Sequence, residues 1–302
     1  MIQAGDLVST VLNSFLVGSM YALLGVSLTL SINGAKMYNW AHGELATVGA
    51  YIAAVLTSFE GMSALIAIPL AMLGAAGLAV AVDESTYKPL VRRGATSIQI
   101  MLASIAVSIF VRYGIFIYAA AAFILTIKAN VETPVLTSIL GVEVTSLYLW
   151  IIPAALVTVF ALRTFLTKTL TGKQIRAMSD NAELARVSGI NVTALRRNVW
   201  IIVGVIAGLA GAFWAMYSFI TPEIGFDLLV DSFAAAIVGG LTYDGTVIAG
   251  YIIGLAENVG AYLLNQTLGV PTQYKILITF SILIAVLIAK PSGLTTKRMR
   301  EL

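Results

Sequence analysis

The stretch TKTLTGKQIRAMSDNAELARVSGINVTALRRNVW, residues 167–200, is the longest polar run in an otherwise apolar sequence. It carries only two acidic residues, Asp180 and Glu183. Its basic residues are Lys168, Lys173, Arg176, Arg186, Arg196 and Arg197. Charges at this density are too costly to place in the hydrocarbon core of a membrane. The stretch is therefore predicted to be a loop outside the bilayer.

Helical spacing within this loop predicts two short amphipathic helices joined by a turn. The apolar stripe, interrupted at 179–181, consists of Ile175, Met178, Leu184, Val187 and Ile190. Gly189 followed by Ile190 and Asn191 is typical of a helix stop. Such a hairpin could dock a cytosolic partner, although any long cytoplasmic loop also collects Lys and Arg. Both interpretations are open on these grounds alone.

The residue pattern of this loop is similar to that of a loop in a known group of membrane proteins. Its second half has the spacing E-x-A-x-x-x-G, and it resembles the "EAA" loop in the membrane subunits of binding-protein-dependent ABC importers. In that group the loop is the coupling helix, which fits a groove on the ATPase subunit. The resemblance implies a coupling role for Gly172, Arg176, Ala177, Glu183, Ala185 and Gly189.

Composition identifies an integral membrane protein. The 302 residues are 59% apolar and 11% charged, with a mean hydropathy of +0.94, which leaves too little polar surface for a soluble globule. There is no Cys and one His, His42, so disulfides, thiolate metal sites and paired imidazoles are excluded. We expect no catalytic residue, no metal and no cofactor. The N-terminal segment lacks a basic region and a cleavage signal, so we expect it to be retained.

The apolar segments predict an all-α polytopic fold in one transmembrane domain, 1–302. About 20 apolar residues cross a bilayer. Eight ordinary spans are expected at 7–32, 45–58, 62–82, 97–127, 147–165, 199–220, 246–264 and 276–289. Two further segments are broken, 33–44 and 228–245. Within the spans, Arg112 is expected to face protein or water or to snorkel to an interface, and Glu257 to be paired, hydrated or protonated.

Basic residues predict the orientation. Fourteen of the 18 Lys and Arg residues lie in three regions, 83–95, 163–197 and 290–302. These regions are expected in the cytoplasm under the positive-inside rule, and they therefore mark topology and not nucleic-acid binding. Placing all three inside requires 228–245 to cross. The side of the N-terminus stays open, because the repeat described next places it inside whereas Lys36 favours the outside.

A weak internal repeat supports this topology. GSMYALL at 18–24 is similar to GAFWAMY at 211–217, and GAYI at 49–52 is similar to GYII at 250–253. The first repeat covers about 7–94 and the second about 198–294. Interrupted apolar segments at corresponding positions of two halves are typical of a transport pathway.

The two broken segments supply the pathway candidates, which are Asn39, His42, Glu44, Asp231, Gly239 and Gly240. Irregular backbone at membrane depth survives only where protein or water satisfies it. We expect these residues to line one route near mid-membrane. The alternative is structural: an Asn cap, a packing histidine and a tight loop at the glycine pair.

Five motifs extend the resemblance along the chain: YNWAHGE at 38–44, YKPLVRRG at 87–94, TGKQIRAMSDNAELARVSGI at 171–190, VGGL at 238–241 and KPSGL at 290–294. In this order they look like the permease subunits of high-affinity branched-chain amino acid ABC importers. The chain departs from that pattern at LTYDG, 241–245, which leaves urea, short amides or other amino acids as alternative substrates.

The resemblance implies a complex in a prokaryotic inner or plasma membrane. Its other parts would be a second permease subunit, similar to this chain or a copy of it, two cytosolic ATPase subunits and an extracytoplasmic solute-binding protein. The chain contains no phosphate-binding loop, so ATP hydrolysis is expected in the separate ATPases. A self-sufficient secondary transporter is the alternative from another class.

Overall fold

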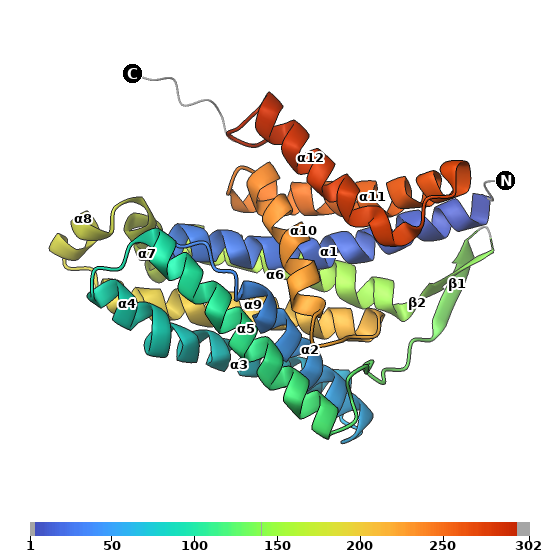
Figure 1. The fold of residues 1–302 in the computed structure, drawn as a ribbon, viewed down its shortest axis with the longest axis horizontal. Coiled ribbons are helices and arrows are strands. Elements are labelled where there is room, and N and C mark those ends of the chain that lie inside the picture. The colour runs from blue at the N-terminus through green and yellow to red at the C-terminus, as the bar shows by residue number, and fades with distance from the viewer. Residues whose placement is uncertain (1–3, 140, 295–302) are drawn as a thin grey trace. The chain divides into compact units, whose positions relative to one another are not determined.

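A computed structural model describes residues 4–139 and 141–294, and within them the regular elements are helices apart from one β-hairpin (Figure 1). The elements are α1 (Ala4–Ala35), α2 (His42–Ser58), α3 (Ala64–Val82), a π-helical turn (Asp83–Tyr87), α4 (Lys88–Arg92), α5 (Ser97–Ala121), β1 (Val135–Ile139), β2 (Val142–Thr145), α6 (Ser146–Lys168), α7 (Leu170–Asp180), α8 (Ala182–Val187), α9 (Val192–Tyr217), α10 (Ile224–Val238), α11 (Tyr243–Leu268), a 3₁₀ turn (Thr272–Lys275) and α12 (Ile276–Ala289).

Seven helices in the described ranges are long and apolar enough to cross a membrane. They contain α1, α3 with α4, α5, α6, α9, α11, and α12 with the preceding 3₁₀ turn. This confirms an all-α polytopic membrane protein. The number is one below the expected eight ordinary spans because α2 has 17 residues, fewer than the roughly 20 that a full crossing needs.

The two interruptions are narrower than the broken segments predicted from the sequence. α1 continues to Ala35, and the irregular backbone of the first interruption begins at Lys36, which has φ 57°. α10 is helical from Ile224 to Val238 and therefore includes Asp231. The second interruption is the turn before α11, where Gly240 has φ 70° and Leu241 has φ 54°.

The chain divides into two compact units, and each is described by itself. Unit 1 comprises residues 1–26, 132–157 and 230–302, and unit 2 comprises 27–131 and 158–229. The chain passes from one unit to the other within α1, α6 and α10, and between residues 131 and 132.

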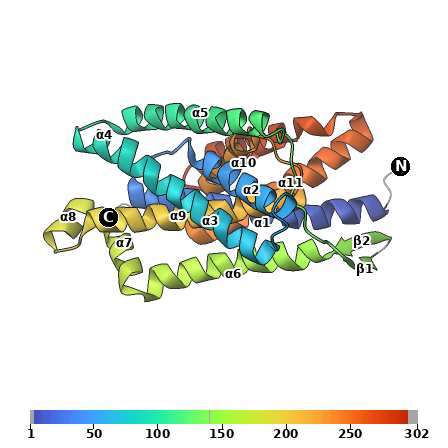
Figure 2. The same ribbon diagram turned by 90° about the horizontal axis from the view of Figure 1, so that it is seen from below.

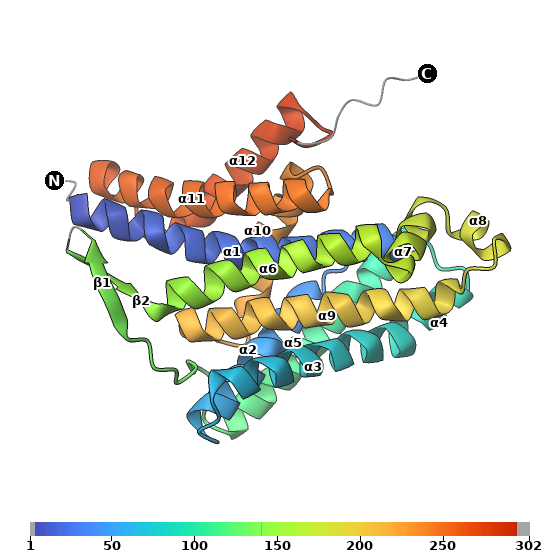
Figure 3. The same cartoon turned by 180° about the vertical axis from the view of Figure 1, so that it is seen from behind.

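Unit 2 has a core of small residues where α2, α3 and α9 pack together. Gly49 of α2 lies directly against Gly208 of α9, and Gly211 of α9 lies against the backbone of Ala46. Gly204 packs in the same way on α3, which runs beside α9 in Figure 3. Small side chains allow helix backbones to approach closely, a common device in membranes where no hydrophobic force joins helices.

Unit 1 contains the first part of α1 together with α11 and α12. Gly250 of α11 packs on Ala22, and Gly254 packs on Gly18. The β-hairpin also lies in this unit, where β1 and β2 pair antiparallel. This β-hairpin was not predicted from the sequence. The hydroxyl of Tyr148, just after the hairpin, donates a hydrogen bond to Asn13 Oδ1 at 2.9 Å.

Candidate functional site

The polar loop of residues 167–200 forms two short helices, α7 and α8, between the end of α6 and the start of α9 (Figure 2). Thr169 Oγ1 caps α7 by accepting a hydrogen bond from the Gly172 N–H at 3.0 Å. Asn181 ends α7 and caps α8, because its Oδ1 accepts from the N–H groups of Glu183 and Leu184 at 3.0 and 2.9 Å. Gly189 follows α8 with φ 84°. The predicted helix–turn–helix and its stop are confirmed.

The hairpin buries the apolar face of α7 and exposes that of α8. Ile175 and Met178 are buried, whereas Leu184 and Val187 are 61% and 80% exposed. The predicted apolar stripe, interrupted at 179–181, is therefore buried on α7 and exposed on α8. The backbone at Asn181 is extended, so the helical periodicity of α7 does not continue into α8. The apolar residues of the two helices therefore do not have to face the same side.

The six residues implied by the resemblance have two different environments. Gly172 and Ala185 are buried within the chain, and Gly172 lies against the backbone of Phe165 and Leu166 with no room for a larger side chain. The exposed members are Arg176, Ala177, Glu183 and Gly189. Gly172 and Ala185 are therefore packed inside the chain, and the other four residues lie on the outer surface of the hairpin.

Two ion pairs fasten the start of α9, the helix that follows the hairpin, to the end of α3. Arg196 is bound to the buried carboxylate of Asp83 through Nη2 at 2.6 Å and Nε at 2.9 Å. Arg197 pairs with Glu84 at 2.9 Å in a more exposed setting. Neither pair was predicted from the sequence, where Arg196 and Arg197 served only to indicate a polar cytoplasmic loop. The sequence signal for these pairs was two adjacent acids just after one apolar segment and two adjacent arginines just before another.

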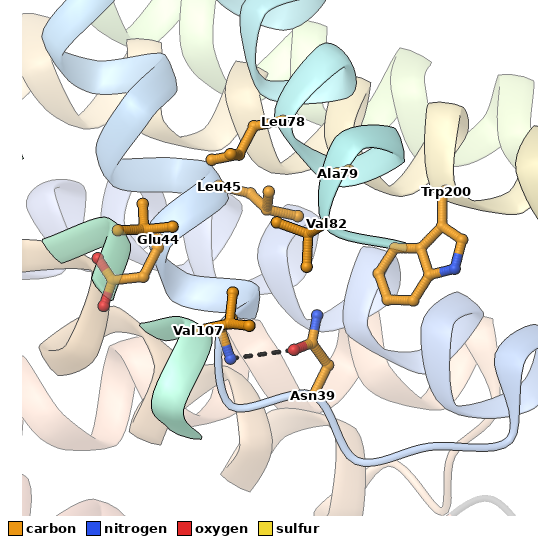
Figure 4. A pocket seen from close by; sticks show the side chains of 10 residues that line it. Asn39, Glu44, Leu45, Leu78, Ala79, Val82, Val107 and Trp200 are labelled. Atoms are coloured by element: carbon orange, nitrogen blue, oxygen red, sulfur yellow. Dashed lines mark hydrogen bonds between the residues drawn. The ribbon is translucent and has the colours of Figure 1, made fainter. Parts of the chain in front are cut away.

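The loop between α1 and α2 is buried and hydrogen-bonded. Asn39 Oδ1 accepts from the Ala41 N–H at 3.0 Å and from the Tyr87 hydroxyl at 2.8 Å. The Nε2 of His42 lies 2.9 Å from Ser27 Oγ. Figure 4 shows Asn39 at the edge of a cavity that Glu44 and Trp200 also line. The cavity measures about 10 Å³, roughly the space of a single water.

Glu44 and Arg112 form a buried ion pair between α2 and α5. Arg112 Nη2 and Nε lie 2.7 and 3.1 Å from Glu44 Oε1, which also accepts from Ser108 at 2.9 Å. The guanidinium group lies 4.8 Å from the centre of the Phe226 ring. The expectation that Arg112 faces protein is confirmed, and the pair removes the net charge from this part of unit 2.

In unit 1, Glu257 of α11 is a buried carboxylate with two polar partners. Its Oε2 accepts from the Tyr21 hydroxyl at 2.8 Å, and its Oε1 lies 3.0 Å from Lys275 Nζ. The glycine pair after α10 allows close backbone contact, since Gly239 abuts the backbone around Thr246 and Gly240 abuts Gly293. The Glu257 carboxylate is therefore paired, which is one of the states predicted for it.

The pathway candidates are enclosed in this conformation. Asn39, His42 and Glu44 are buried in unit 2, and Asp231 and Gly239 are buried in unit 1, where Gly240 is half-buried. The hydrogen bonds of Asn39 and Glu44 give both residues structural roles. Since the cavity beside them holds about one water, a solute could pass there only after a rearrangement. A pathway lined by these residues stays a prediction.

Known branched-chain amino acid transport permeases match this chain over almost its whole length. The family described as "Branched-chain amino acid transport system / permease component" matches residues 10–287. The chain is 28% identical over 294 residues to the high-affinity branched-chain amino acid transport system permease protein BraD of Pseudomonas aeruginosa, covering 93% of each chain. It is 30% identical over 289 residues to the probable branched-chain amino acid transport permease protein LivH of Methanocaldococcus jannaschii, covering 92% of this chain and 89% of that one.

A solved structure shares the fold. It is described as "An inward-facing conformation of a putative metal-chelate type ABC transporter", and it matches with a TM-score of 0.51, 16% identity, and coverage of 94% of this chain and 85% of that one. At this identity the likeness concerns the arrangement of helices alone.

Proposed function

The chain belongs to the family of branched-chain amino acid transport permease components, and from this membership we propose that it is the membrane permease of an ATP-driven importer for leucine, isoleucine and valine. The full-length match to relatives named for branched-chain amino acids supports this substrate class. Those relatives do not favour urea, short amides or a self-sufficient transporter.

The exposed apolar residues of α8 support ATPase docking more than any other feature. Leu184 and Val187 are exposed on a hairpin whose other exposed residues are largely polar or charged. Exposed apolar side chains on the spanning helices are covered by lipid, but this hairpin is too polar to enter hydrocarbon. A protein surface is the remaining cover, and an exposed apolar pair surrounded by polar residues is typical of such an interface. The ATPase subunit is the proposed occupant.

The ion pairs at the start of α9 provide a route by which docking could move the membrane helices. The hairpin continues directly into α9, and Arg196 binds the buried Asp83 at the end of α3. α3 and α9 also share the close small-residue packing of unit 2. We propose that movement of the hairpin is passed to both helices together.

The proposed complex follows the positive-inside rule. The regions 83–95 and 163–197 and the C-terminus lie in the cytoplasm with two ATPase subunits, and residues 295–302 of that tail lie outside the described range. A solute-binding protein delivers substrate from the other side, and a second permease subunit completes the membrane part. We propose that the segments around 42–44 and 231–240 line the route in a more open conformation of the chain.

Charge substitution on α8 tests the docking proposal. Leu184→Glu and Val187→Glu place a carboxylate on the proposed interface, and we expect ATPase binding at least about tenfold weaker, since hot-spot contacts contribute about 2 kcal/mol or more. Binding is measured by titrating the purified permease with its cognate ATPase subunits. A substitution at Ala185 would not test docking, because the Ala185 side chain is buried within the chain itself.

Val135→Glu is the matched control, because Val135 is 50% exposed on β1 and is proposed to lie on the opposite side of the membrane. This variant should bind the ATPases and transport like the wild type. If Leu184→Glu and Val187→Glu also bind normally, α8 is not the docking surface.

A further inference from the structure

A second group of ionisable side chains lies inside unit 1. Asp231 of α10 is 5% exposed and Glu257 of α11 is 1% exposed. The hydroxyl groups of Tyr21 and Thr279 lie close enough to interact with the Asp231 carboxylate as donors, and the charges of Glu257 and Lys275 also interact with it. They come from α1, α11, the 3₁₀ turn and α12. We refer to these five residues as the Asp231 cluster.

Within the Asp231 cluster, Glu257 has polar partners for both carboxylate oxygens, whereas Asp231 and Thr279 each have a buried oxygen without one. Both carboxylate oxygens of Glu257 are satisfied, one by the Tyr21 hydroxyl and the other by the Lys275 ammonium group. Asp231 Oδ1 and Thr279 Oγ1 are buried, and neither makes a hydrogen bond of normal geometry. A buried oxygen without a partner is strongly disfavoured, and in native structures it commonly marks a bound ion, a water or a proton.

The charges of the cluster do not balance. Asp231 and Glu257 each carry a negative charge when ionised, whereas Lys275 supplies a single positive charge. Desolvation makes an uncompensated buried charge unfavourable, so such sites are normally neutralised by a partner or an added cation. The ion pair of Glu44 and Arg112 in unit 2 is balanced, so the imbalance is particular to unit 1.

We propose that the Asp231 cluster binds one monovalent cation, a proton or an alkali ion, at Asp231 Oδ1 and Thr279 Oγ1. Carboxylate and hydroxyl oxygens are the hard ligands that alkali ions prefer. A proton bound at the same carboxylate would donate a hydrogen bond to Thr279. Either cation removes the net charge and satisfies both oxygens.

Thermal unfolding of the purified full chain in lipid nanodiscs tests the site and distinguishes the two cations. Melting temperatures are compared in sodium, potassium and choline chloride at equal ionic strength. A bound alkali ion raises the melting temperature above that in choline, by on the order of 3 °C at saturating salt. A bound proton leaves salts without effect. Because the folded chain then holds a proton that the unfolded chain releases, stability in choline falls as pH rises.

Three variants connect either effect to the cluster. Asp231→Asn should remove the salt dependence and the cluster's part of the pH dependence, since the amide is neutral and can itself donate to Thr279. Thr279→Val should weaken an alkali ion's effect at least about tenfold in concentration, because one ligand is lost. Glu223→Gln, at an exposed position of unit 2, should behave like the wild type.

Direct measurements remain decisive if Asp231→Asn fails to fold. Binding of ²²Na⁺ to the wild type, weakened in Thr279→Val, indicates an alkali ion. The infrared band of a protonated carboxyl group in sodium-free buffer indicates a proton. If the wild type binds no ²²Na⁺, shows no such band, and unfolds with the same salt and pH dependence as Asp231→Asn, the proposal is overturned.

Discussion

At the scale of single residues, buried charges decide which helices of this membrane chain are held together. The sequence indicated that Arg112 and Glu257 needed partners, because an isolated charge in a membrane is costly. It could not indicate which partners, since Glu44 lies 68 positions from Arg112. Those pairings depend on the packing of helices that are distant in sequence.

Breaking the Glu44–Arg112 pair on one side should destabilise the chain more than replacing both residues. Glu44→Leu leaves the Arg112 guanidinium group without a counter-ion, and loss of one partner of a buried pair costs about 3–5 kcal/mol. In the double variant Glu44→Leu/Arg112→Leu, both charges are gone and much of that stability should return. Unfolding curves for wild type, both single variants and the double variant provide the measurement. A double variant less stable than either single variant would contradict this account.

At the scale of elements, local signals predicted the hairpin well and its packing poorly. Asn181 and Gly189 mark the turn and the stop by their own chemistry, so both were readable from the sequence. The exposed face of α8 depends on how the hairpin lies on the rest of unit 2. The β-hairpin was missed although its signal was present, namely β-branched residues on either side of Gly141.

The packing of α2 on α9 should be sensitive to one methyl group. A Cβ atom at Gly211 would meet the backbone of Ala46, so Gly211→Ala must separate the helices and should destabilise by about 1–3 kcal/mol. Gly114→Ala in α5 is the control, because that position has open space around it and alanine is the better helix former. Melting temperatures should fall for the first variant and hold or rise for the second. Equal melting temperatures would exclude close packing at Gly211.

The ion pair between α9 and α3 should matter for coupling between the ATPases and transport. In an importer assembled with its ATPases, Arg196→Gln should retain ATP hydrolysis but lower solute transported per ATP by on the order of tenfold, because the guanidinium contact to the buried Asp83 is lost. Arg197→Gln is the comparison, since Arg197 is 57% exposed and exposed pairs contribute about 0–1 kcal/mol. Equal transport per ATP in the two variants would remove the link from the mechanism.

At the scale of the whole molecule, the sequence was sufficient for class and family but not for the detailed path of the chain. Apolar runs of spanning length determine a polytopic fold almost by themselves, because only helices and closed barrels satisfy their backbone in lipid. The pathway residues could not be resolved in this way. In the described conformation five of the six are buried, and the sequence does not indicate which conformation opens.

Single cysteines report the orientation cleanly, because the chain contains no cysteine of its own. Cysteines replacing Arg92 and Lys173, both exposed, should react with impermeant thiol reagents only from the cytoplasm. One replacing the exposed Glu132 should react only from outside. A fourth position, Lys297, lies outside the described residues and should label from the cytoplasm. Labelling of positions 92 and 173 from opposite faces would overturn the orientation.

Uptake of radiolabelled leucine into proteoliposomes tests the central proposal most directly. The permease is reconstituted with the second permease subunit and the ATPase subunits, ATP is enclosed on the ATPase side, and the solute-binding protein is added on the other. We predict leucine accumulation that requires all of these components and is competed by isoleucine and valine but not by urea. Leucine accumulation by this chain alone, without ATPases or binding protein, would contradict the assignment as an importer subunit.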